Sequence, residues 1–161
     1  SPEDMREISR TFGGVEHRAE FVGEYNGVKY YNDSIASSPT RTALGTLSLY
    51  DEKIIIIAGG YDKHIPYEPL GPVINDKVKV LILLGDTAPK IEKAVVEAEN
   101  YNENEITIIN VTNMEEAVEA AVNHAEKGDI VSLSPASASF GLYKNFEERG
   151  NHFKAIVNAL K

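Results

Sequence analysis

Short, mainly apolar stretches alternate along this chain with longer stretches in which apolar residues recur three or four positions apart. The apolar stretches cover residues 54–58, 78–84, 106–111 and 130–133. Runs of branched apolar residues of this length are typical of β-strands buried on both faces. The longer stretches predict helices over residues 39–49, 66–74, 88–99, 114–126 and 146–160.

The segment 18–32 has a different pattern, in which apolar and polar residues nearly alternate on both sides of Asn26-Gly27. Asn-Gly favours a type I′ turn because both central residues of that turn need positive φ. We therefore predict a β-hairpin here. At the N-terminus, Ser1 and Pro2 suit the start of a short helix that Gly13-Gly14 would end.

Strands that alternate with helices indicate right-handed βαβ crossovers and a mostly parallel sheet. The predicted fold is an α/β, Rossmann-like three-layer domain with an N-terminal β-hairpin and helices on both faces of the sheet. The 161 residues suit one domain, and no linker divides them. We therefore treat residues 1–161 as a single domain.

Charge and composition exclude several classes of protein. The chain has 16 Lys and Arg against 25 Asp and Glu, a net charge of −9, and no visible basic patch, so we expect no nucleic-acid partner. Its apolar runs are too short to cross a membrane, and we expect no membrane contact. The polar, acidic start does not resemble a signal peptide, which favours a cytoplasmic protein or an excised fragment of one. Without cysteine, disulfides and thiolate chemistry are excluded, and the spacing of the histidines predicts no metal site.

Three polar loops follow the predicted strands, and the carboxyl ends of parallel strands meet at the edge where ligands bind. Their sequences are Asn32-Asp33-Ser34-Ile35-Ala36-Ser37-Ser38, Gly59-Gly60-Tyr61-Asp62-Lys63 and Ser134-Pro135-Ala136-Ser137-Ala138-Ser139. Lys63 offers a cation for a carboxylate or phosphate, and the third loop is typical of a helix N-terminus that binds an anion. The alternatives are ordinary: a tight turn with a solvated lysine, and serines that merely cap helices.

Known phosphate-binding and nucleophile motifs are missing. The chain has no G-x-x-x-x-G-K-[ST], no G-x-G-x-x-G and no G-x-S-x-G sequence. We therefore do not expect an independent kinase, a nicotinamide dehydrogenase or a serine hydrolase.

Five motifs, taken in order, resemble the C-terminal domain of Mur ligases, and most closely that of the D-glutamate-adding members. They are His17-Arg18, Gly27-Val28 leading to Asn32-Asp33-Ser34, Gly59-Gly60-Tyr61-Asp62-Lys63, Gly128-Asp129 leading to the serine-rich loop, and Phe146-Glu147-Glu148-Arg149-Gly150. The resemblance covers nearly the whole chain, from about residue 14 to residue 160.

The resemblance implies an ATP-dependent amide ligase of peptidoglycan synthesis. Such an enzyme phosphorylates UDP-N-acetylmuramoyl-L-alanine, and the amine of D-glutamate then attacks the acyl phosphate. The family's N-terminal UDP-binding domain and its central P-loop domain, which mainly holds ATP and Mg²⁺, would be absent from this chain. The chain alone should therefore be inactive and would carry no catalytic residue of its own.

The resemblance also assigns residues to the two substrates. D-glutamate would be bound by Ser37, Lys63, Ser139, Phe140 and Phe146, with the phenylalanines acting mainly as backbone or wall. Arg18 and Asp33 would reach the nucleotide when this domain closes on the central one, and Asn32 would support that loop.

One position departs from the family's pattern. Ile35 stands where the commoner form of the first loop has lysine, and Arg41 is a candidate replacement for that cation. The lack of an Asp-Asn-Pro-Arg sequence, which relatives that add diaminopimelate or lysine carry, favours D-glutamate. Two alternatives stay open: a non-catalytic binding module for an acidic metabolite, and a related amide ligase that uses another amino acid.

Overall fold

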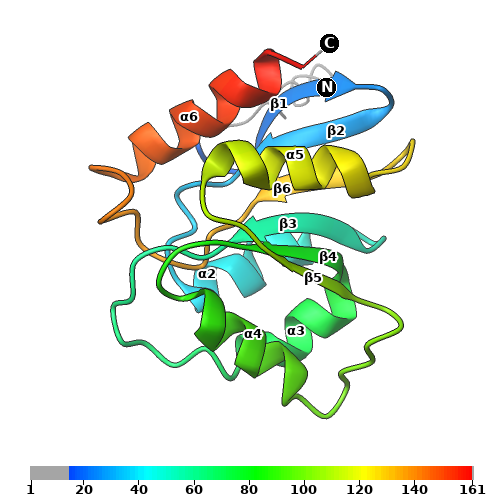
Figure 1. Cartoon of the computed structure of the whole chain (residues 1–161), viewed down its shortest axis with the longest axis vertical. Helices are drawn as coiled ribbons and strands as arrows, with labels where there is room; N and C mark the ends of the chain where they lie inside the picture. Colours follow the sequence, from blue (N-terminus) through cyan, green and yellow to red (C-terminus); the bar gives the residue numbers. More distant parts are fainter. Residues whose placement is uncertain (1–14, 161) are drawn as a thin grey trace.

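The computed structural model describes residues 15–160 as two helical layers that enclose one sheet (Figure 1). Its six strands lie in the order β1-β2-β6-β3-β4-β5. The strands are β1 (Glu20–Tyr25), β2 (Val28–Asn32), β3 (Ile54–Ala58), β4 (Val78–Leu83), β5 (Thr107–Asn110) and β6 (Ile130–Leu133). The helices are α2 (Pro39–Leu44), the short 3-10 helix η1 (Thr46–Ser48), α3 (Leu70–Lys77), α4 (Ala88–Val96), α5 (Met114–His124) and α6 (Phe146–Asn158).

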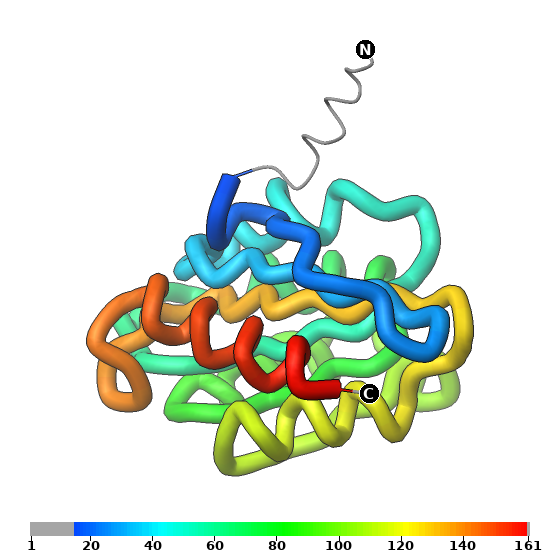
Figure 2. Tube along the Cα trace, turned by 90° about the horizontal axis from the view of Figure 1, so that it is seen from above, coloured from blue at the N-terminus to red at the C-terminus, as the bar shows by residue number. Residues whose placement is uncertain are grey.

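The sheet is parallel except for the antiparallel pair β1–β2, so the predicted α/β fold with an N-terminal hairpin is confirmed. Asn26 and Gly27 both have positive φ, of 54° and 78°, as a type I′ turn requires. The hairpin lies beside α6 in the view from above (Figure 2), where Lys154 of α6 donates hydrogen bonds to Glu16 and Glu20.

Alternation along β3 divides the core into two layers. Ile54, Ile56 and Ala58 pack with buried residues of α3 and α4, whereas Ile55 and Ile57 pack with those of α5 and α6. Both sides of β3 are therefore fully buried, as its continuous apolar sequence predicts. Among residues 15–160, no helix is long and apolar enough to cross a membrane.

Several predicted boundaries were wrong. The helix predicted over residues 39–49 is broken at Gly45, where α2 gives way to η1. The helix predicted over residues 66–74 begins instead at Leu70 and runs to Lys77. Proline disfavours helical backbone in the residue before it, and Pro69 is the N-cap of this helix. The helix expected in the first dozen residues lies outside the described residues.

Candidate functional site

Backbone hydrogen bonds join the carboxyl ends of β2, β6 and β3 into one edge. The amide of Asp33 donates to the carbonyl of Leu133 at 2.9 Å, and the amide of Ser134 donates to Ile57 at 2.9 Å. The amide of Gly59 reaches the carbonyl of Pro135 at 2.8 Å. The three polar loops therefore meet, as the parallel topology predicts.

Gly59 permits a close approach between neighbouring strand ends. Its φ is +110°, and a Cβ at this position would lie 1.9 Å from the carbonyl oxygen of Leu84. Two residues later, the amide of Tyr61 donates to Ala138 at 2.8 Å, which ties the Lys63 loop to the serine-rich loop. Lys63 itself is exposed, and no ion pair joins its ammonium group to another of residues 15–160.

The serine-rich loop is not a helix N-terminus, and that prediction was wrong. Residues 134–145 form irregular backbone, and the next helix, α6, begins at Phe146 with Asn145 as its N-cap. Ala136 has a φ of 55°, and the hydrogen bonds to Gly59 and Tyr61 hold the loop against β3. The side chains of Ser137 and Ser139 are buried in this loop, with 0% and 7% exposure.

Arg149 of α6 connects the first and third loops, although the sequence analysis assigned it no role. Its Nε donates to Ser34 Oγ at 3.0 Å, and its Nη2 donates to the Ser34 carbonyl at 2.7 Å and to Ser37 Oγ at 3.3 Å. Its Nη1 donates to the carbonyl of Ser137 at 2.9 Å. One guanidinium group therefore fixes both serine-bearing loops.

The charge of Arg149 is buried without a carboxylate partner among residues 15–160. The side chain is 3% exposed, and no ion pair within this part of the chain includes it. Burial lowers the pKa of Arg149 to about 10, so the group remains protonated at neutral pH. A buried, unneutralised cation favours anions at the edge of the sheet that it supports.

Contacts bring Ser37, Ser139 and Phe146 of the predicted D-glutamate set around Arg149. Ser37 accepts from it directly, Ser139 lines the same small pocket, and the Phe146 carbonyl accepts from Ser34 Oγ at 2.6 Å. Phe140 is 58% exposed and packs edge-on against Tyr61, with ring centroids 5.7 Å apart. Lys63 lies on the loop that the Tyr61 amide ties to Ala138, and no hydrogen bond or ion pair within residues 15–160 joins it to this group.

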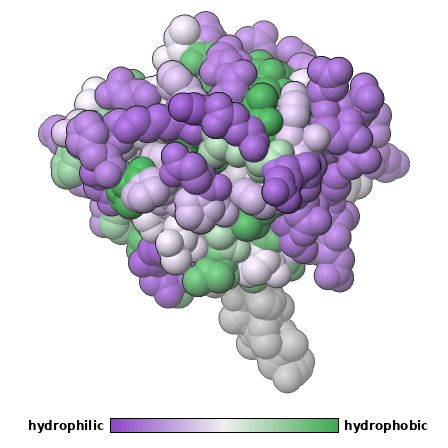
Figure 3. Space-filling view, turned by 90° about the horizontal axis from the view of Figure 1, so that it is seen from below, coloured by the Kyte–Doolittle hydropathy of each residue, from purple (hydrophilic) through white to green (hydrophobic). Residues whose placement is uncertain are grey.

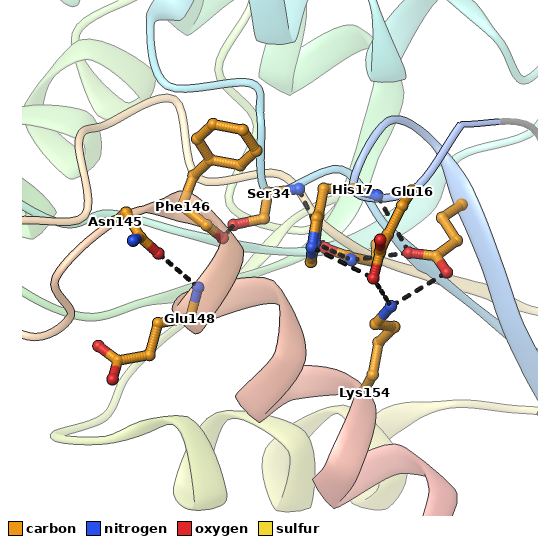
Figure 4. Close-up of polar contacts among 9 residues, drawn as sticks. Glu16, His17, Ser34, Asn145, Phe146, Glu148 and Lys154 are labelled. Carbon is orange, nitrogen blue, oxygen red and sulfur yellow. Dashed lines mark hydrogen bonds and ion pairs between the residues drawn. The ribbon is translucent and has the colours of Figure 1, made fainter.

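His17 links the start of the hairpin to α6 (Figure 4). Asn32 Oδ1 accepts from the Ser34 amide at 3.0 Å, so its Nδ2 faces Nδ1 of His17 at 2.9 Å. Because Nδ2 can only donate, Nδ1 of His17 is the acceptor in this contact. The ring also packs edge-on against Phe146, at 5.8 Å between centroids.

Asp33 and Arg18 face a cavity of about 340 Å³ that Arg41 also lines. Asp33 is 4% exposed: its Oδ1 accepts from the amide of Ala19 at 3.0 Å, and its Oδ2 accepts from Thr46 Oγ1. Arg18 and Arg41 are exposed. The cavity thus has two arginines at its border and a carboxylate anchored in its wall.

A second, larger groove of about 580 Å³ lies between the 64–68 segment and α4. Lys90 and Lys93 line it together with Glu68 and Glu97, so charges of both signs meet there. In the view from below, hydrophilic side chains dominate the surface and apolar areas are small and scattered (Figure 3). Because the carboxylates of Glu68 and Glu97 offset the two lysines, this groove favours an anion less than the edge around Arg149 does.

Comparison with known proteins places the chain in a family. It matches the family described as Mur ligase, glutamate ligase domain, over residues 17–137. A UDP-N-acetylmuramoylalanine–D-glutamate ligase of Acetivibrio thermocellus is 59% identical over 159 residues, which cover 98% of this chain and 34% of that protein. The enzyme of the same name from Clostridium botulinum strain Hall is 56% identical over 160 residues, 99% of this chain and 35% of that protein.

Solved structures show the same fold at low sequence identity. The murein peptide ligase Mpl of Psychrobacter arcticus has a TM-score of 0.58 at 16% identity, over 92% of this chain and 31% of that one. E. coli FolC in complex with ADP has a TM-score of 0.58 at 15% identity, over 89% of this chain and 32% of that one. The chain spans about a third of the length of the curated relatives it matches. The match across residues 17–137 and the close relatives together show that the chain belongs to the Mur ligase family, in its glutamate ligase domain.

Proposed function

We propose that this chain is the amino-acid-binding domain of an ATP-dependent ligase that joins D-glutamate to UDP-N-acetylmuramoyl-L-alanine in peptidoglycan synthesis. The names of relatives that are 56% and 59% identical across nearly the whole chain support this assignment. The remaining two domains, one for the UDP substrate and one with the P-loop, belong to the rest of the polypeptide in this proposal.

The buried cation Arg149 carries the proposal for the amino-acid site. A dicarboxylate needs fixed cations and hydrogen-bond donors, because carboxylates accept hydrogen bonds most strongly from charged and hydroxyl groups. Lys63 is an exposed ammonium on one loop, and Ser37 and Ser139 are hydroxyl donors on the two loops that Arg149 joins. Phe140 and Phe146 would form the wall beside them.

The cavity lined by Arg18, Asp33 and Arg41 supports a nucleotide contact at the first loop. Arg18 and Arg41 would face phosphate groups of ATP. Asn32 is fully buried, so in this proposal it acts by holding His17 and Ser34 in place.

In the proposed reaction, the γ-phosphoryl group of ATP passes to the alanine carboxylate, and the amine of D-glutamate displaces phosphate to form the amide. ATP and Mg²⁺ would be held mainly by the rest of the polypeptide, and within residues 15–160 no group of three or more acidic or histidine side chains is arranged around a metal position. This chain would bind and orient the amino acid, and it should not turn over alone.

The test is phosphate release by the full-length polypeptide with ATP, Mg²⁺, UDP-N-acetylmuramoyl-L-alanine and a panel of amino acids. We expect release that depends on D-glutamate, with L-glutamate, lysine and diaminopimelate inactive. Release with a different amino acid, and none with D-glutamate, would overturn the assignment. The isolated chain serves as the matched control and should release no phosphate.

A further inference from the structure

A row of buried hydroxyl groups joins the loop that carries Lys63 to the loop that carries Ser139. The Gly60 amide donates to Thr87 Oγ1 at 2.9 Å, and Thr87 Oγ1 lies 2.8 Å from Ser137 Oγ. Ser137 Oγ lies 2.9 Å from the Tyr67 hydroxyl, which donates to the Ala136 carbonyl at 3.0 Å. Thr87 and Ser137 are 0% exposed and Tyr67 is 3% exposed.

The two ends of this row determine which hydroxyl donates and which accepts in every hydrogen bond along it. Each hydroxyl has one hydrogen to donate, and Tyr67 gives its hydrogen to the Ala136 carbonyl. Ser137 must then donate to Tyr67, and Thr87 must donate to Ser137, which leaves a Thr87 lone pair for the Gly60 amide. All three hydroxyls are satisfied in this single arrangement, and hydrogen bonds that run in one direction strengthen one another.

The row fixes the loops that follow three different strands. Gly60 follows β3, Thr87 follows β4, and Ser137 follows β6. The Thr87 amide also donates to the Gly60 carbonyl at 3.0 Å, so Thr87 holds both polar groups of Gly60. Lys63 lies three residues beyond Gly60, and Ser139 lies two residues beyond Ser137.

We propose that Thr87, Ser137 and Tyr67 are positioning residues that set the distance between Lys63 and Ser139, and thereby the affinity of the site for its amino-acid dicarboxylate. This inference rests on the proposed function. None of the three hydroxyls needs to touch the substrate, because each is already used within the row. Thr87 is the member to test first, because its hydroxyl joins the Gly60 backbone to the Ser137 side chain and so links the two loops.

The decisive variant is Thr87→Val, which keeps the shape of the side chain and removes its donor and acceptor. It leaves the buried Gly60 amide without an acceptor and removes the donor to Ser137 Oγ, which keeps only its bond to Tyr67. Loss of these two contacts allows the two loops to separate. In the full-length ligase we expect the KM for D-glutamate to rise about tenfold. We expect the KM for ATP to stay within about twofold of the parent value, because the nucleotide cavity lies on the first loop.

Thr87→Ser is the matched control, because it restores the hydroxyl and removes one methyl group. It should return the KM for D-glutamate close to the parent value, whereas a role in packing alone would make Thr87→Ser the more impaired of the two variants, because Val fills the same volume as Thr. Tyr67→Phe, at the far end of the row, should raise the same KM by a smaller factor.

A folded Thr87→Val enzyme with an unchanged KM for D-glutamate would overturn this inference and leave the proposed function intact. A parent enzyme that is inactive with D-glutamate would instead contradict the proposed function, and the inference with it. Circular dichroism and a thermal melt of each variant show whether it is folded. If Thr87→Val does not fold, Thr87→Ser and Tyr67→Phe decide the question: an unchanged KM in Tyr67→Phe would count against the row.

Discussion

Nη2 of Arg149 lies 2.7 Å from the carbonyl oxygen of Ser34, a residue 115 positions earlier in the chain. Together with the bonds to Ser137 and Ser37, this contact makes one buried guanidinium the common support of two loops. Replacing Arg149 with Met would remove the donor from two carbonyls, those of Ser34 and Ser137, and from two serine hydroxyls, those of Ser34 and Ser37. We expect Arg149→Met to lower the free energy of unfolding by about 3 kcal/mol.

Urea unfolding of this chain measures that loss, and Arg18→Met is the control because Arg18 is exposed. Arg149→Lys should fall between the parent and Arg149→Met, since one ammonium group cannot reproduce the planar set of donors. Equal stability of Arg149→Met and Arg18→Met would contradict the structural role given to Arg149.

Alanine substitutions at Gly59 and Gly128 distinguish the cost of backbone strain from the cost of a steric clash. Both have positive φ, of +110° and +97°, but a Cβ at Gly59 would lie 1.9 Å from Leu84 O, whereas nothing lies within 4 Å of one at Gly128. Gly128→Ala should cost about 1 to 2 kcal/mol for the left-handed backbone alone. Gly59→Ala should cost at least about 2 kcal/mol more, because the backbone at Leu84, directly after β4, must move.

Thermal or urea unfolding of the two variants gives the comparison directly. Similar losses at both positions would show that the close approach of Gly59 to Leu84 is unimportant for stability.

The hydroxyl of the partly buried Tyr50 should lower the free energy of unfolding at alkaline pH. Burial raises the pKa of the Tyr50 hydroxyl, and the charges of Tyr31, Asp33 and Glu52 raise it further. Above about pH 10 a tyrosine in the unfolded chain ionises while the folded one stays protonated, so the folded state is destabilised as pH rises. Below that pH both states carry the proton and the group contributes no pH dependence.

Tyr50→Phe should therefore unfold like the parent chain at pH 7 apart from a constant offset, and should lose less stability near pH 11. The difference between the two chains should grow by about 1 kcal/mol over that interval. Parallel stability curves for the two chains up to pH 11 would count against a raised Tyr50 pKa.

Arg41, the candidate replacement for the cation missing at Ile35, lines the same cavity as Arg18 and Asp33. If that cavity receives ATP phosphates, Arg41→Ala in the full-length ligase should raise the KM for ATP about fivefold to tenfold. Arg41→Lys should recover part of the loss. The KM for D-glutamate provides the internal control and should not change. An Arg41→Ala enzyme with the parent KM for ATP would exclude Arg41 from nucleotide binding.

Local sequence patterns predicted the strands and the hairpin well. The branched run in β3 and the Asn26-Gly27 turn each depend on local chemistry that the sequence displays directly. Helix ends were less predictable, because Gly45 and Pro69 interrupt stretches whose apolar spacing continues past them.

The supporting residues of the site were missed for a tertiary reason. Arg149 follows Glu147 and Glu148 and therefore has the appearance of a solvated helix face. It is buried because Gly150 lets α6 approach the hairpin: a Cβ there would lie 2.2 Å from Nδ1 of His17. Thr87 stands at the N-cap of α4, yet its hydroxyl makes no capping bond and accepts from Gly60 instead. Neither contact leaves a periodic signal in the sequence.

The central claim is that the loops at this edge bind the amino acid through Lys63, and steady-state kinetics of Lys63→Ala in the full-length ligase test it most directly. Lys29→Ala is the control, since Lys29 is an exposed lysine near the opposite, amino end of β2. Loss of one charge-assisted contact predicts a KM for D-glutamate that is about 10- to 100-fold higher in Lys63→Ala, with the KM for ATP unchanged and Lys29→Ala equal to the parent. A folded Lys63→Ala enzyme with the parent KM for D-glutamate would contradict the account.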